Sequence, residues 1–431
     1  MKDKISRLRL HTSAWQNLWS LDPDVVFLNH GSFGACPLPV LAAQQRLRQQ
    51  LEREPVRFFM REFEALLDDA RSKLATFVGA NPDDLAFVPN ATTGVNTVLR
   101  SLQFERGDEL LTTDQEYNAC RNALDFVAKR AGAQVVVAKI PFPIESPEQV
   151  VEAVMERVSP RTRLALIDHI TSQTGLIFPI QQIAHHLANR GVELLVDGAH
   201  APGMIPLNLR ELEATYYTGN CHKWLCAPKG AAFLYVRRER HSAIRPLTIS
   251  HGANSPRSDR SRFQLEFDWT GTDDPTAYLC VPEAIRFMGS LLLGGWSELM
   301  ARNRAMVLAA RQLLCQTLAV MPPCPPEMIG SMAVVPLLDI ATQPAAGAAS
   351  SGCVEQAEVL EAGGVPPLQN FLFEFGIEVP VILRGETPRQ LIRVSAQLYN
   401  TQEQYEYLAS VLSAIGCSKI IDRVESKPSH A

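Results

Sequence analysis

The sequence predicts an α/β fold in which a mainly parallel sheet is covered by helices on both faces. Over about 200 residues, from residue 84 onward, apolar runs of strand length alternate with segments of helical periodicity, the order that produces parallel strands joined by crossover helices. The main runs are short and apolar, as expected for strands buried on both faces. After residue 326 strands and helices alternate again, so we expect a second, smaller α/β domain.

Local patterns justify each predicted element. Helix 94–102 places Val95, Val98 and Leu99 on one face, and helix 181–190 closes on Gly191, the residue type that favours a left-handed turn after a helix. The predicted strands are 84–88, 108–113, 134–140, 164–170, 192–197, 215–218 and 231–236. The other predicted helices are 122–130, 282–293 and 296–318.

Three stretches interrupt this alternation. Residues 251–274 are polar and irregular, and a loop of this length is expected to have a function or to contact another subunit. The proline-rich residues 321–326 mark a boundary, and residues 341–352, rich in Ala, Gly and Ser, are typical of a flexible surface insertion. The expected domains are an N-terminal segment at 1–30 that packs with the small domain, a large cofactor-binding domain at 31–290 and a small C-terminal domain at 291–431.

Composition and charge are those of a soluble protein that handles small molecules. The 41 basic and 46 acidic side chains give a net charge of −5, which offers no basic surface for nucleic acid or an anionic membrane. Nine cysteines occur without a CxxC pair, so we expect no metal site and no disulfide framework, and reduced thiols fit the cytoplasm. No signal sequence and no run of about 18 apolar residues are found, so neither secretion nor membrane spanning is expected.

Lys223 and Asp197 carry the clearest chemical signal. Lys223 stands between His222 and Trp224, and Asp197 ends the apolar run VELLVD 26 residues earlier. A lysine attacks an aldehyde only when burial or a neighbouring cation lowers its pKa. An aspartate at the carboxyl edge of a parallel sheet can keep the ring nitrogen of pyridoxal phosphate protonated. Singly, a solvated lysine and a helix-capping aspartate would explain them, but together they indicate a Schiff-base lysine and its cofactor.

A second signal is a helix start made of small and hydroxyl residues. Residues 90–94, NATTG, lie between a predicted strand and helix 94–102, where backbone N–H groups and the helix dipole favour a bound phosphate. An N-cap without a ligand would give the same pattern. Tyr117, after strand 108–113, would either stack on a cofactor ring or simply pack in the fold.

The motifs around these residues resemble those of the class V aminotransferase family, which are fold-type I pyridoxal phosphate enzymes. The resemblance runs from Phe27 to Tyr407, and the residues of its motifs are most similar to those of the isopenicillin N epimerase-like branch. The motifs are FLNHGSFGACP, PNATTGVN, DQEYNAC, VDGAHAPG, TGNCHKWLCAPKG and WTGTDDPTAYL. The resemblance implies a large domain with a mainly parallel seven-stranded sheet, a smaller C-terminal domain, and an enzyme that binds pyridoxal 5′-phosphate.

The resemblance also implies a role for each matching residue. Lys223 would form the internal aldimine, Asp197 would pair with the pyridine nitrogen, and His200 would reach the phenolate oxygen with Ser172 nearby. Tyr117 would occupy the ring-stacking position. The residues implied to bind the phosphate are Thr92, Thr93, Asn220 and His222.

Further implied roles concern a second subunit and the substrate. Gly271 and Thr272 would reach the phosphate bound to the partner, which implies a homodimer. Arg393 would hold the substrate carboxylate as a bidentate pair, although a surface strand arginine would look the same. Asn29 and His30 would lie on the substrate side of the cofactor, where a structural role for His30 is the alternative.

One departure from the family narrows the expected chemistry. Desulfurases that form a persulfide place a nucleophilic cysteine on the loop before the carboxylate-binding arginine, and residues 376–393 contain none. A C–S lyase that eliminates sulfide would not need that thiol.

The expected function is therefore that of an epimerase-like enzyme acting at the Cα of an amino acid or amine, through an external aldimine and a carbanion. The alternatives are a cysteine or cystine C–S lyase, an aminotransferase, and a catalytically silent binding protein with the same fold. The substrate and the second proton donor stay open.

Overall fold

The computed structural model describes residues 13–337, 365–386 and 388–425. The chain forms two compact units, one made of residues 31–301 and the other of residues 1–30 together with 302–431. The predicted insertion at 341–352 lies outside the described residues. The expectation that 1–30, 31–290 and 291–431 act as separate domains stays a prediction. No helix in the described ranges is both long enough and apolar enough to cross a membrane.

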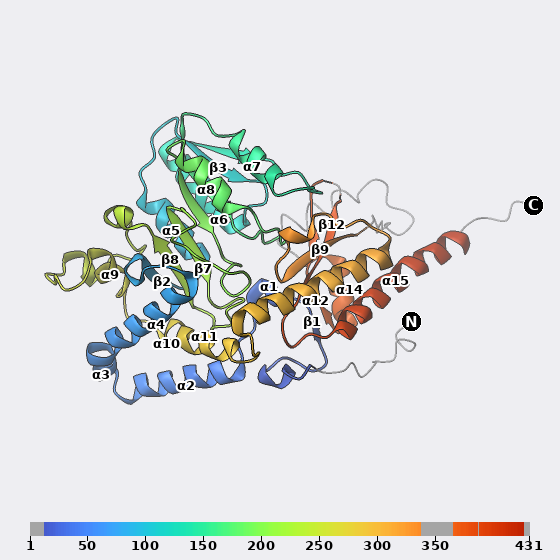
Figure 1. The fold of residues 1–431 in the computed structure, drawn as a ribbon, viewed down its shortest axis with the longest axis horizontal. Coiled ribbons are helices and arrows are strands. Elements are labelled where there is room, and N and C mark those ends of the chain that lie inside the picture. Colours follow the sequence, from blue (N-terminus) through green and yellow to red (C-terminus); the bar gives the residue numbers. More distant parts are fainter. Residues whose placement is uncertain (1–12, 338–364, 387, 426–431) are drawn as a thin grey trace, which may run out of the picture. The chain divides into compact units, whose positions relative to one another are not determined.

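A seven-stranded sheet forms the centre of the 31–301 unit (Figure 1). The strand order is β2-β8-β7-β6-β5-β3-β4, and β8 runs in the opposite direction to the other six strands. The strands are β2 (Leu85–Val88), β3 (Glu109–Thr113), β4 (Gln134–Ala138), β5 (Thr162–Asp168), β6 (Glu193–Asp197), β7 (Tyr216–Asn220) and β8 (Ala232–Val236). The prediction of an α/β fold with a mainly parallel seven-stranded sheet is confirmed.

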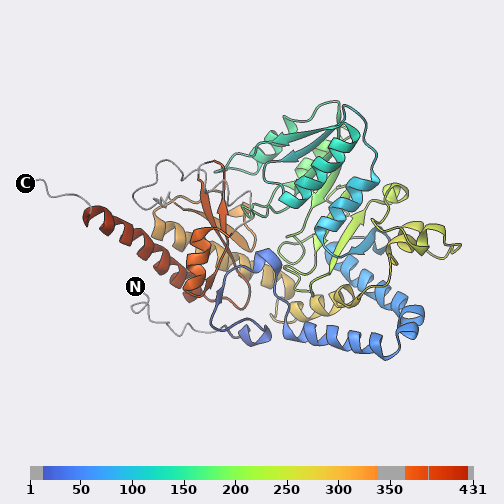
Figure 2. The same ribbon diagram turned by 180° about the vertical axis from the view of Figure 1, so that it is seen from behind.

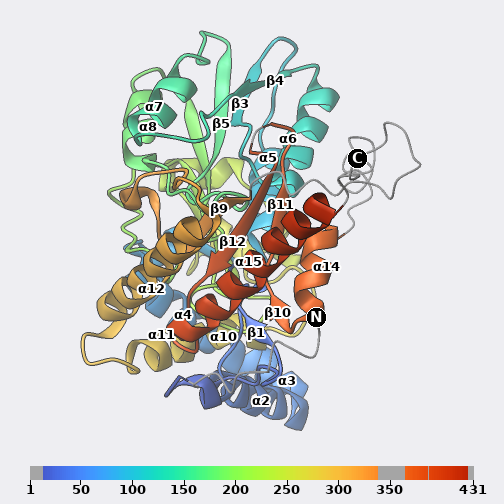
Figure 3. The ribbon, with the colours of Figure 1, turned by 90° about the vertical axis from the view of Figure 1, so that its right-hand side faces the viewer.

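Helices cover this sheet on both faces, as Figure 3 shows with α5 and α6 on one side and α7 and α8 on the other. Their bounds are α5 (Ala91–Ser101), α6 (Asn118–Ala131), α7 (Glu148–Met155) and α8 (Ile180–Ala188). Because each helix connects two parallel strands, its N-terminus follows the carboxyl end of the strand before it. The starts of α5 and α6 therefore lie at the same edge as the ends of β5, β6 and β7.

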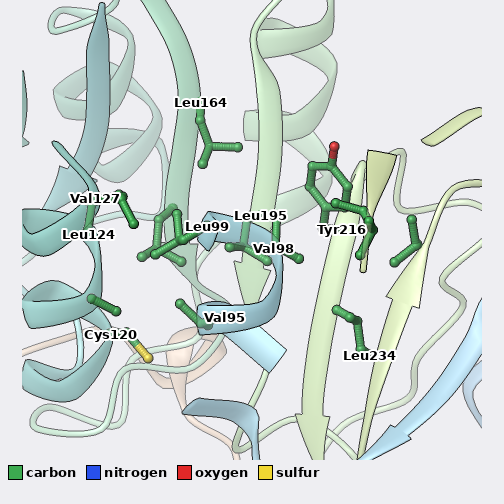
Figure 4. Packing of buried hydrophobic residues seen from close by; sticks show 14 of the residues in the cluster. Val95, Val98, Leu99, Cys120, Leu124, Val127, Leu164, Leu195, Tyr216 and Leu234 are labelled. Atoms are coloured by element: carbon green, nitrogen blue, oxygen red, sulfur yellow. The ribbon is translucent and has the colours of Figure 1, made fainter. Parts of the chain in front are cut away.

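The core between the sheet and the pair α5 and α6 is apolar and closely packed (Figure 4). From the helices come Val95, Val98, Leu99, Cys120, Leu124 and Val127, and from the strands come Leu164, Leu195, Tyr216 and Leu234. These side chains are almost completely buried, and each stabilises the fold by about 1.5–3 kcal/mol through removal of apolar surface from water. Cys120 belongs to this core and also borders the carboxyl edge of the sheet.

A second group of helices lies in the same unit, where α10 and α11 each contact both α2 and α4 (Figure 2). These helices are α2 (Leu38–Arg53), α4 (Phe63–Val78), α10 (Thr276–Leu279) and α11 (Val281–Gly289). Shorter helices complete the unit: α1 (His30–Phe33), α3 (Pro55–Arg57), η2 (Phe58–Glu62), η3 (Pro82–Asp84), η4 (Arg238–Ala243), η5 (His251–Asn254) and α9 (Arg262–Phe267). The helix α12 (Gly295–Leu318) begins in this unit and continues into the other.

The other unit is built on a small antiparallel sheet in the order β11-β12-β9. Its elements are β9 (Met332–Leu337), β11 (Val381–Leu383), β12 (Gln390–Ser395), η1 (Gln16–Leu18), η6 (Pro326–Met328), α14 (Pro367–Glu374) and α15 (Gln402–Glu425). A separate two-stranded ribbon pairs β1 (Val26–Phe27) in parallel with β10 (Ile377–Glu378). This ribbon joins the N-terminal segment to the C-terminal part of the chain.

The stretch 251–274, interpreted from sequence as an irregular loop, contains the short helices η5 and α9. Helix α9 starts with a capping box, in which the Ser261 hydroxyl accepts from the Gln264 backbone while the Gln264 side chain accepts from the Ser261 backbone. A serine followed three residues later by glutamine is the signal for this motif. This helix was not predicted from sequence, because it has only six residues and polar residues surround it.

Candidate active site

Three buried residues form a row where the parallel strands end. Asp168 closes β5 and pairs in register with Asp197, the last residue of β6, which in turn pairs with Thr218 of β7. Neighbouring strands lie about 4.8 Å apart, so three strands contribute side chains to one small region. Ligands of open α/β sheets bind at this carboxyl edge.

Two donors hold the Asp197 carboxylate. Its Oδ1 accepts the backbone N–H of Ala199 at 2.9 Å, and its Oδ2 accepts the S–H of Cys120 at 3.1 Å. Cys120 lies in the first turn of α6, so this helix and strand β6 position the carboxylate together. Hydrogen bonds to both oxygens favour the ionised form of a carboxyl group.

Lys223 and His200 are in hydrogen-bond contact. The distance from Lys223 Nζ to His200 Nε2 is 3.0 Å, and Trp224 Nε1 donates to His200 Nδ1 at 3.4 Å. An indole N–H can only donate, so His200 Nδ1 is the acceptor for Trp224. Lys223 Nζ faces the other ring nitrogen, Nε2, and this amine attacks a carbonyl once it has lost its proton.

The backbone segment that carries Lys223 packs directly against Gly34. Gly34 has φ +69°, and a Cβ there would lie 2.2 Å from the His222 carbonyl oxygen and 2.9 Å from the Lys223 Cα. Lys229 Nζ donates to the Gly34 carbonyl oxygen at 2.8 Å. Only glycine permits this approach, so two segments far apart in the sequence determine each other's position.

The start of α5 has both a cap and a spare donor. Asn90 Oδ1 accepts the N–H of Thr93 at 2.8 Å and its hydroxyl at 3.0 Å, while Asn220 Oδ1 accepts the N–H of Ala91 at 2.8 Å. Within the described ranges, the N–H of Thr92 has no protein acceptor. The two sequence interpretations are therefore compatible, because Asn90 is a true N-cap and the Thr92 N–H remains available to an anion.

His222 is a neutral ring. Its Nδ1–H donates to the Ala231 carbonyl oxygen at 3.0 Å, and burial lowers the pKa of the imidazole to about 4. In this state Nε2 is a hydrogen-bond acceptor. His222 can therefore bind a phosphate through Nε2 only in its protonated form, which a neighbouring dianion would favour.

A hydroxyl network fixes the loop that carries Ser172. The Thr174 hydroxyl donates to Gln115 Oε1 at 3.0 Å, and the Thr171 hydroxyl donates to Thr174 Oγ1 at 2.7 Å. All three partners are buried, and sequence reasoning did not select them. Tyr117, which follows this glutamine by two positions, caps α6 with 45% of its surface exposed, which favours a ring open to a ligand over one packed in the core.

The tip and the base of the loop with Gly271 and Thr272 differ sharply. Both residues are exposed, and no atom lies within 4 Å of the position that a Gly271 Cβ would take. At the base, Asp268 contacts the guanidinium of Arg71, which is only 2% exposed, and that of Arg260. The base is thus anchored to α4, while the two residues at the tip are exposed.

A cavity of about 470 Å³ opens beside this loop and is lined by Thr93, Lys229 and Gly271 among others. Neither Lys223 nor Asp197 lines it. Its size suits a small ligand, but the cavity meets the predicted site only through Thr93 and the loop tip.

The predicted substrate residues belong to the other unit, where they contact one another. Arg393 on β12 is 3% exposed, and its Nη2 donates to Asn29 Oδ1 at 3.4 Å. Asn29 Nδ2 donates to Glu378 Oε1 at 3.2 Å. Burial lowers the pKa of the Arg393 guanidinium to about 10, so it stays charged at neutral pH and favours a carboxylate partner.

His30 is completely buried in this unit, and its Nδ1 lies 2.8 Å from the Tyr399 hydroxyl. The phenol ring also packs at 5.9 Å from the imidazole, centroid to centroid. These contacts support the structural role that sequence left open as the alternative for His30.

Sequence reasoning missed three groups near Asp197. Neither Cys120 nor Glu116 nor Asp168 was selected as a site residue. One oxygen each of Glu116 and Asp197 and the Cys120 sulfur nevertheless lie within 4.8 Å of one another. The signal was present in DQEYNAC, where the acid and the thiol are four residues apart, and in the aspartate that ends β5 as Asp197 ends β6. The expectation that the chain binds no metal stays a prediction.

Comparison with known proteins gives one consistent family. The model of the aminotransferase class-V family matches residues 35–315. An isopenicillin N epimerase from Amycolatopsis lactamdurans is 35% identical over 94% of this chain and 99% of its own length. A probable chloroplastic L-cysteine desulfhydrase from Arabidopsis thaliana is 30% identical over 91% of this chain and 83% of its own length.

Among solved structures, a cystine C–S lyase in complex with its product cysteine persulfide superposes with a TM-score of 0.71. It is 20% identical, over 90% of this chain and 97% of the lyase. At this identity the match speaks for the fold alone.

Proposed function

Since the chain belongs to the aminotransferase class-V family, whose members are pyridoxal 5′-phosphate enzymes, we propose that it uses this cofactor at the Cα of an amino acid or related amine. The family match covers residues 35–315, which include Lys223 and Asp197. The observation that carries the proposal is the contact of the Lys223 amine with His200, 3.0 Å apart, at the carboxyl edge that Asp197 closes.

The residues present fit this cofactor in three respects. At the α5 N-terminus, the Thr92 N–H has no acceptor in the described part of the chain, and a Cβ on Gly94 would lie 2.2 Å from Thr218 Oγ1, so the helix start approaches the sheet closely. The Asp197 carboxylate would hold the ring nitrogen. The lone pair on Lys223 Nζ would bind the aldehyde.

We assign the remaining contacts by their chemistry. Thr92 and Thr93 would bind the phosphate through the helix N-terminus, joined by Asn220 and a protonated His222. Tyr117 would stack on the ring. Ser172 and His200 would face the phenolate oxygen.

When bound, pyridoxal phosphate would supply an electron sink for negative charge at the substrate Cα. The chain's own groups would do the rest. Lys223 Nζ would accept the Cα proton, and His200 would orient that amine through Nε2. Asp197 would keep a positive charge on the ring nitrogen, and Arg393, with Asn29 beside it, would hold the substrate carboxylate.

The proposed outcome is epimerase-like, with the proton returned to the opposite face of Cα. Relatives named isopenicillin N epimerase, 35% and 34% identical over most of this chain, support this choice. A second candidate is a C–S lyase, supported by relatives named cysteine desulfhydrase and by the absence of a cysteine from residues 376–393.

We further propose a homodimer in which Gly271 and Thr272 reach the partner's cofactor, supported by the exposed tip of their loop. A cytoplasmic location is proposed as well. Seven cysteines between residues 36 and 324 are free thiols, which fits a reducing compartment.

The first test is covalent capture of the cofactor by Lys223. After incubation with pyridoxal phosphate and reduction with borohydride, the wild type should retain the cofactor on the peptide that contains Lys223. Lys223→Ala should retain none at this peptide, whereas the exposed Lys73→Ala should behave as the wild type. A folded wild-type protein that takes up no cofactor would contradict the proposal.

A panel of amino acids in deuterated water would then separate the outcomes. Deuterium at Cα with loss of optical activity indicates epimerisation, a keto acid indicates transamination, and sulfide with pyruvate indicates elimination. If sulfide forms and no deuterated, racemised amino acid is found, the proposed epimerase-like activity is wrong and the protein is a C–S lyase.

A further inference from the structure

The carboxyl edge of the sheet carries three buried acidic side chains, although a single carboxylate is enough to pair with one ring nitrogen. Besides Asp197, both Glu116 and Asp168 are buried there, with 5% and 2% of their surfaces exposed. An oxygen of Glu116 lies within 4.8 Å of one of Asp197, and Asp168 is the register neighbour of Asp197 across the sheet. Carboxylates this close in a dry environment cannot all be ionised, because each charge raises the cost of the next.

Hydrogen-bond donors are unequally shared among these acids. Asp197 accepts from Ala199 on one oxygen and from the Cys120 thiol on the other. Glu116 Oε2 accepts from the Thr112 hydroxyl at 3.3 Å, while its Oε1 is buried without a hydrogen-bond partner. Donors favour an ionised carboxylate, so the charge belongs on Asp197 and the proton on Glu116.

We propose that Glu116 is a positioning residue that keeps its proton, so that Asp197 carries the negative charge that faces the cofactor, and that the Cys120 thiol orients Asp197. An ionised Glu116 would instead share the attraction for the ring-nitrogen proton and loosen its pairing with Asp197. The consequence for the cofactor rests on the proposed function, but the protonation of Glu116 is a property of the chain itself.

Burial and the neighbouring acids outweigh the hydrogen bonds from the Thr112 hydroxyl and the Tyr117 backbone, which lower the pKa of Glu116. Burial raises the pKa of the Glu116 carboxyl, and the charges of Asp168 on β5 and Asp197 on β6 raise it further. Burial also raises the pKa of the Cys120 thiol, on α6, which therefore remains an S–H donor. The positive charge of Lys223 lowers the pKa of Asp168, the neighbouring acid on β5.

Infrared spectroscopy of the cofactor-free protein at neutral pH tests the proposal directly. Glu116→Gln should remove the carbonyl stretch of one protonated carboxylic acid. The matched control is Glu109→Gln, which replaces another buried carboxyl, at the start of β3, whose pKa is held low by Ser159 and Arg161. This control should remove no such band. A folded Glu116→Gln variant that loses no band would overturn the proposal.

A second variant tests the coupling. Asp197→Asn removes one of the charges that raise the pKa of Glu116, so the acid band should disappear at lower pH than in the wild type. An unchanged titration would show that the two acids do not interact. Both measurements are made without cofactor, so they stand even if pyridoxal phosphate fails to bind.

In the cofactor-loaded protein, the pH midpoint of the cofactor absorbance should be the same in the wild type and in Glu116→Gln, because both carry an uncharged side chain at this position. A shift of this midpoint by about one pH unit or more corresponds to a tenfold change in proton affinity. Such a shift would show that Glu116 is charged when the cofactor is present, and would overturn the proposal.

Discussion

His169 and His222 are both kept neutral by burial, which lowers each pKa to about 4. His169 is buried directly after β5, where its Nδ1 lies 2.9 Å from the Tyr217 hydroxyl and its backbone N–H donates to the Asp197 carbonyl oxygen at 2.8 Å. Protonation of this ring would place an unpaired charge beside the strand that ends in Asp197.

The stability of the protein should therefore depend on pH through His169. Its ordinary pKa of 6.5 applies in the unfolded chain, and the folded value is about 4. Since the unfolded state binds more protons between these values, the contribution is fully present above pH 6.5 and is lost as the pH falls toward 4. The loss amounts to about 3 kcal/mol.

Urea unfolding measured across this pH range would check the effect. His169→Asn, which has no titrating group, should remove about half of the dependence, because His222 has the same lowered pKa and contributes over the same pH range. His185→Asn, at an exposed position, should leave the dependence unchanged. A His169→Asn variant with the wild-type dependence would assign the effect to other groups.

At the scale of elements, the segment between β7 and β8 is held by its neighbours as much as by its own hydrogen bonds. The backbone N–H groups of Cys221 and His222 both donate to the Ala231 carbonyl, at 3.0 and 3.1 Å. From outside, Gly34 contacts the carbonyl of His222 and the Cα of Lys223. The lysine is thus presented by two elements that belong to different parts of the sequence.

Gly34→Ala should displace the lysine segment. The new Cβ would lie 2.2 Å from a backbone oxygen, which cannot move without moving Lys223, so covalent capture of the cofactor should fall by tenfold or more, about 1.4 kcal/mol or more. Gly107→Ala is the matched control, because Gly107 also has a positive φ, +92°, but nothing lies within 4 Å of its Cβ position.

Both variants should lose about 1–3 kcal/mol of stability from the backbone conformation alone. The borohydride capture distinguishes them. Equal capture in the two variants would show that the contact with Gly34 does not position Lys223.

At the scale of the whole molecule, the proposed dimer makes each site a product of two chains. Thr272→Glu places a negative charge on the exposed loop tip, so it should repel the partner's phosphate without disturbing its own fold. A homodimer of Thr272→Glu should therefore lose covalent capture of the cofactor at Lys223. A homodimer of Lys223→Ala should also lose capture, because it lacks the amine.

Mixed subunits of the two variants should recover capture. In a hybrid dimer one site combines an intact Lys223 with the intact loop of the other chain, so random mixing of equal amounts restores about a quarter of the sites. The recovered label should lie on the Thr272→Glu subunit, as mass spectrometry can show. No recovery after denaturation and joint refolding would contradict the shared site.

The sheet is the part of the fold that sequence predicted well. Each of the seven predicted strands overlaps one of β2 to β8, because strands buried on both faces are apolar runs that polar turns delimit. The short helix α9 was not predicted, because six residues are too few to show a helical period. Its capping box, SRFQ, was the available signal.

Some of the site residues could be identified from the local sequence, and others could not. Lys223 and Asp197 could be selected because each stands at a recognisable position, a strand end or a conspicuous motif. Glu116 and Cys120 could not, because an acid just before a helix and a thiol in its first turn acquire a role only when Asp197 is brought beside them.

The sequence by itself therefore determined the α/β class, the parallel sheet and the family motifs, including TGNCHKWLCAPKG, since these depend on local periodicity and on residue type. Only the tertiary structure decided which groups meet: the amine of Lys223 with His200, the thiol of Cys120 with Asp197, and Gly34 with the lysine segment. The physical reason is that hydrogen bonding, charge and burial act over a few ångströms of space, and residues separated by 23, 77 or nearly 200 positions reach that distance only in the folded chain.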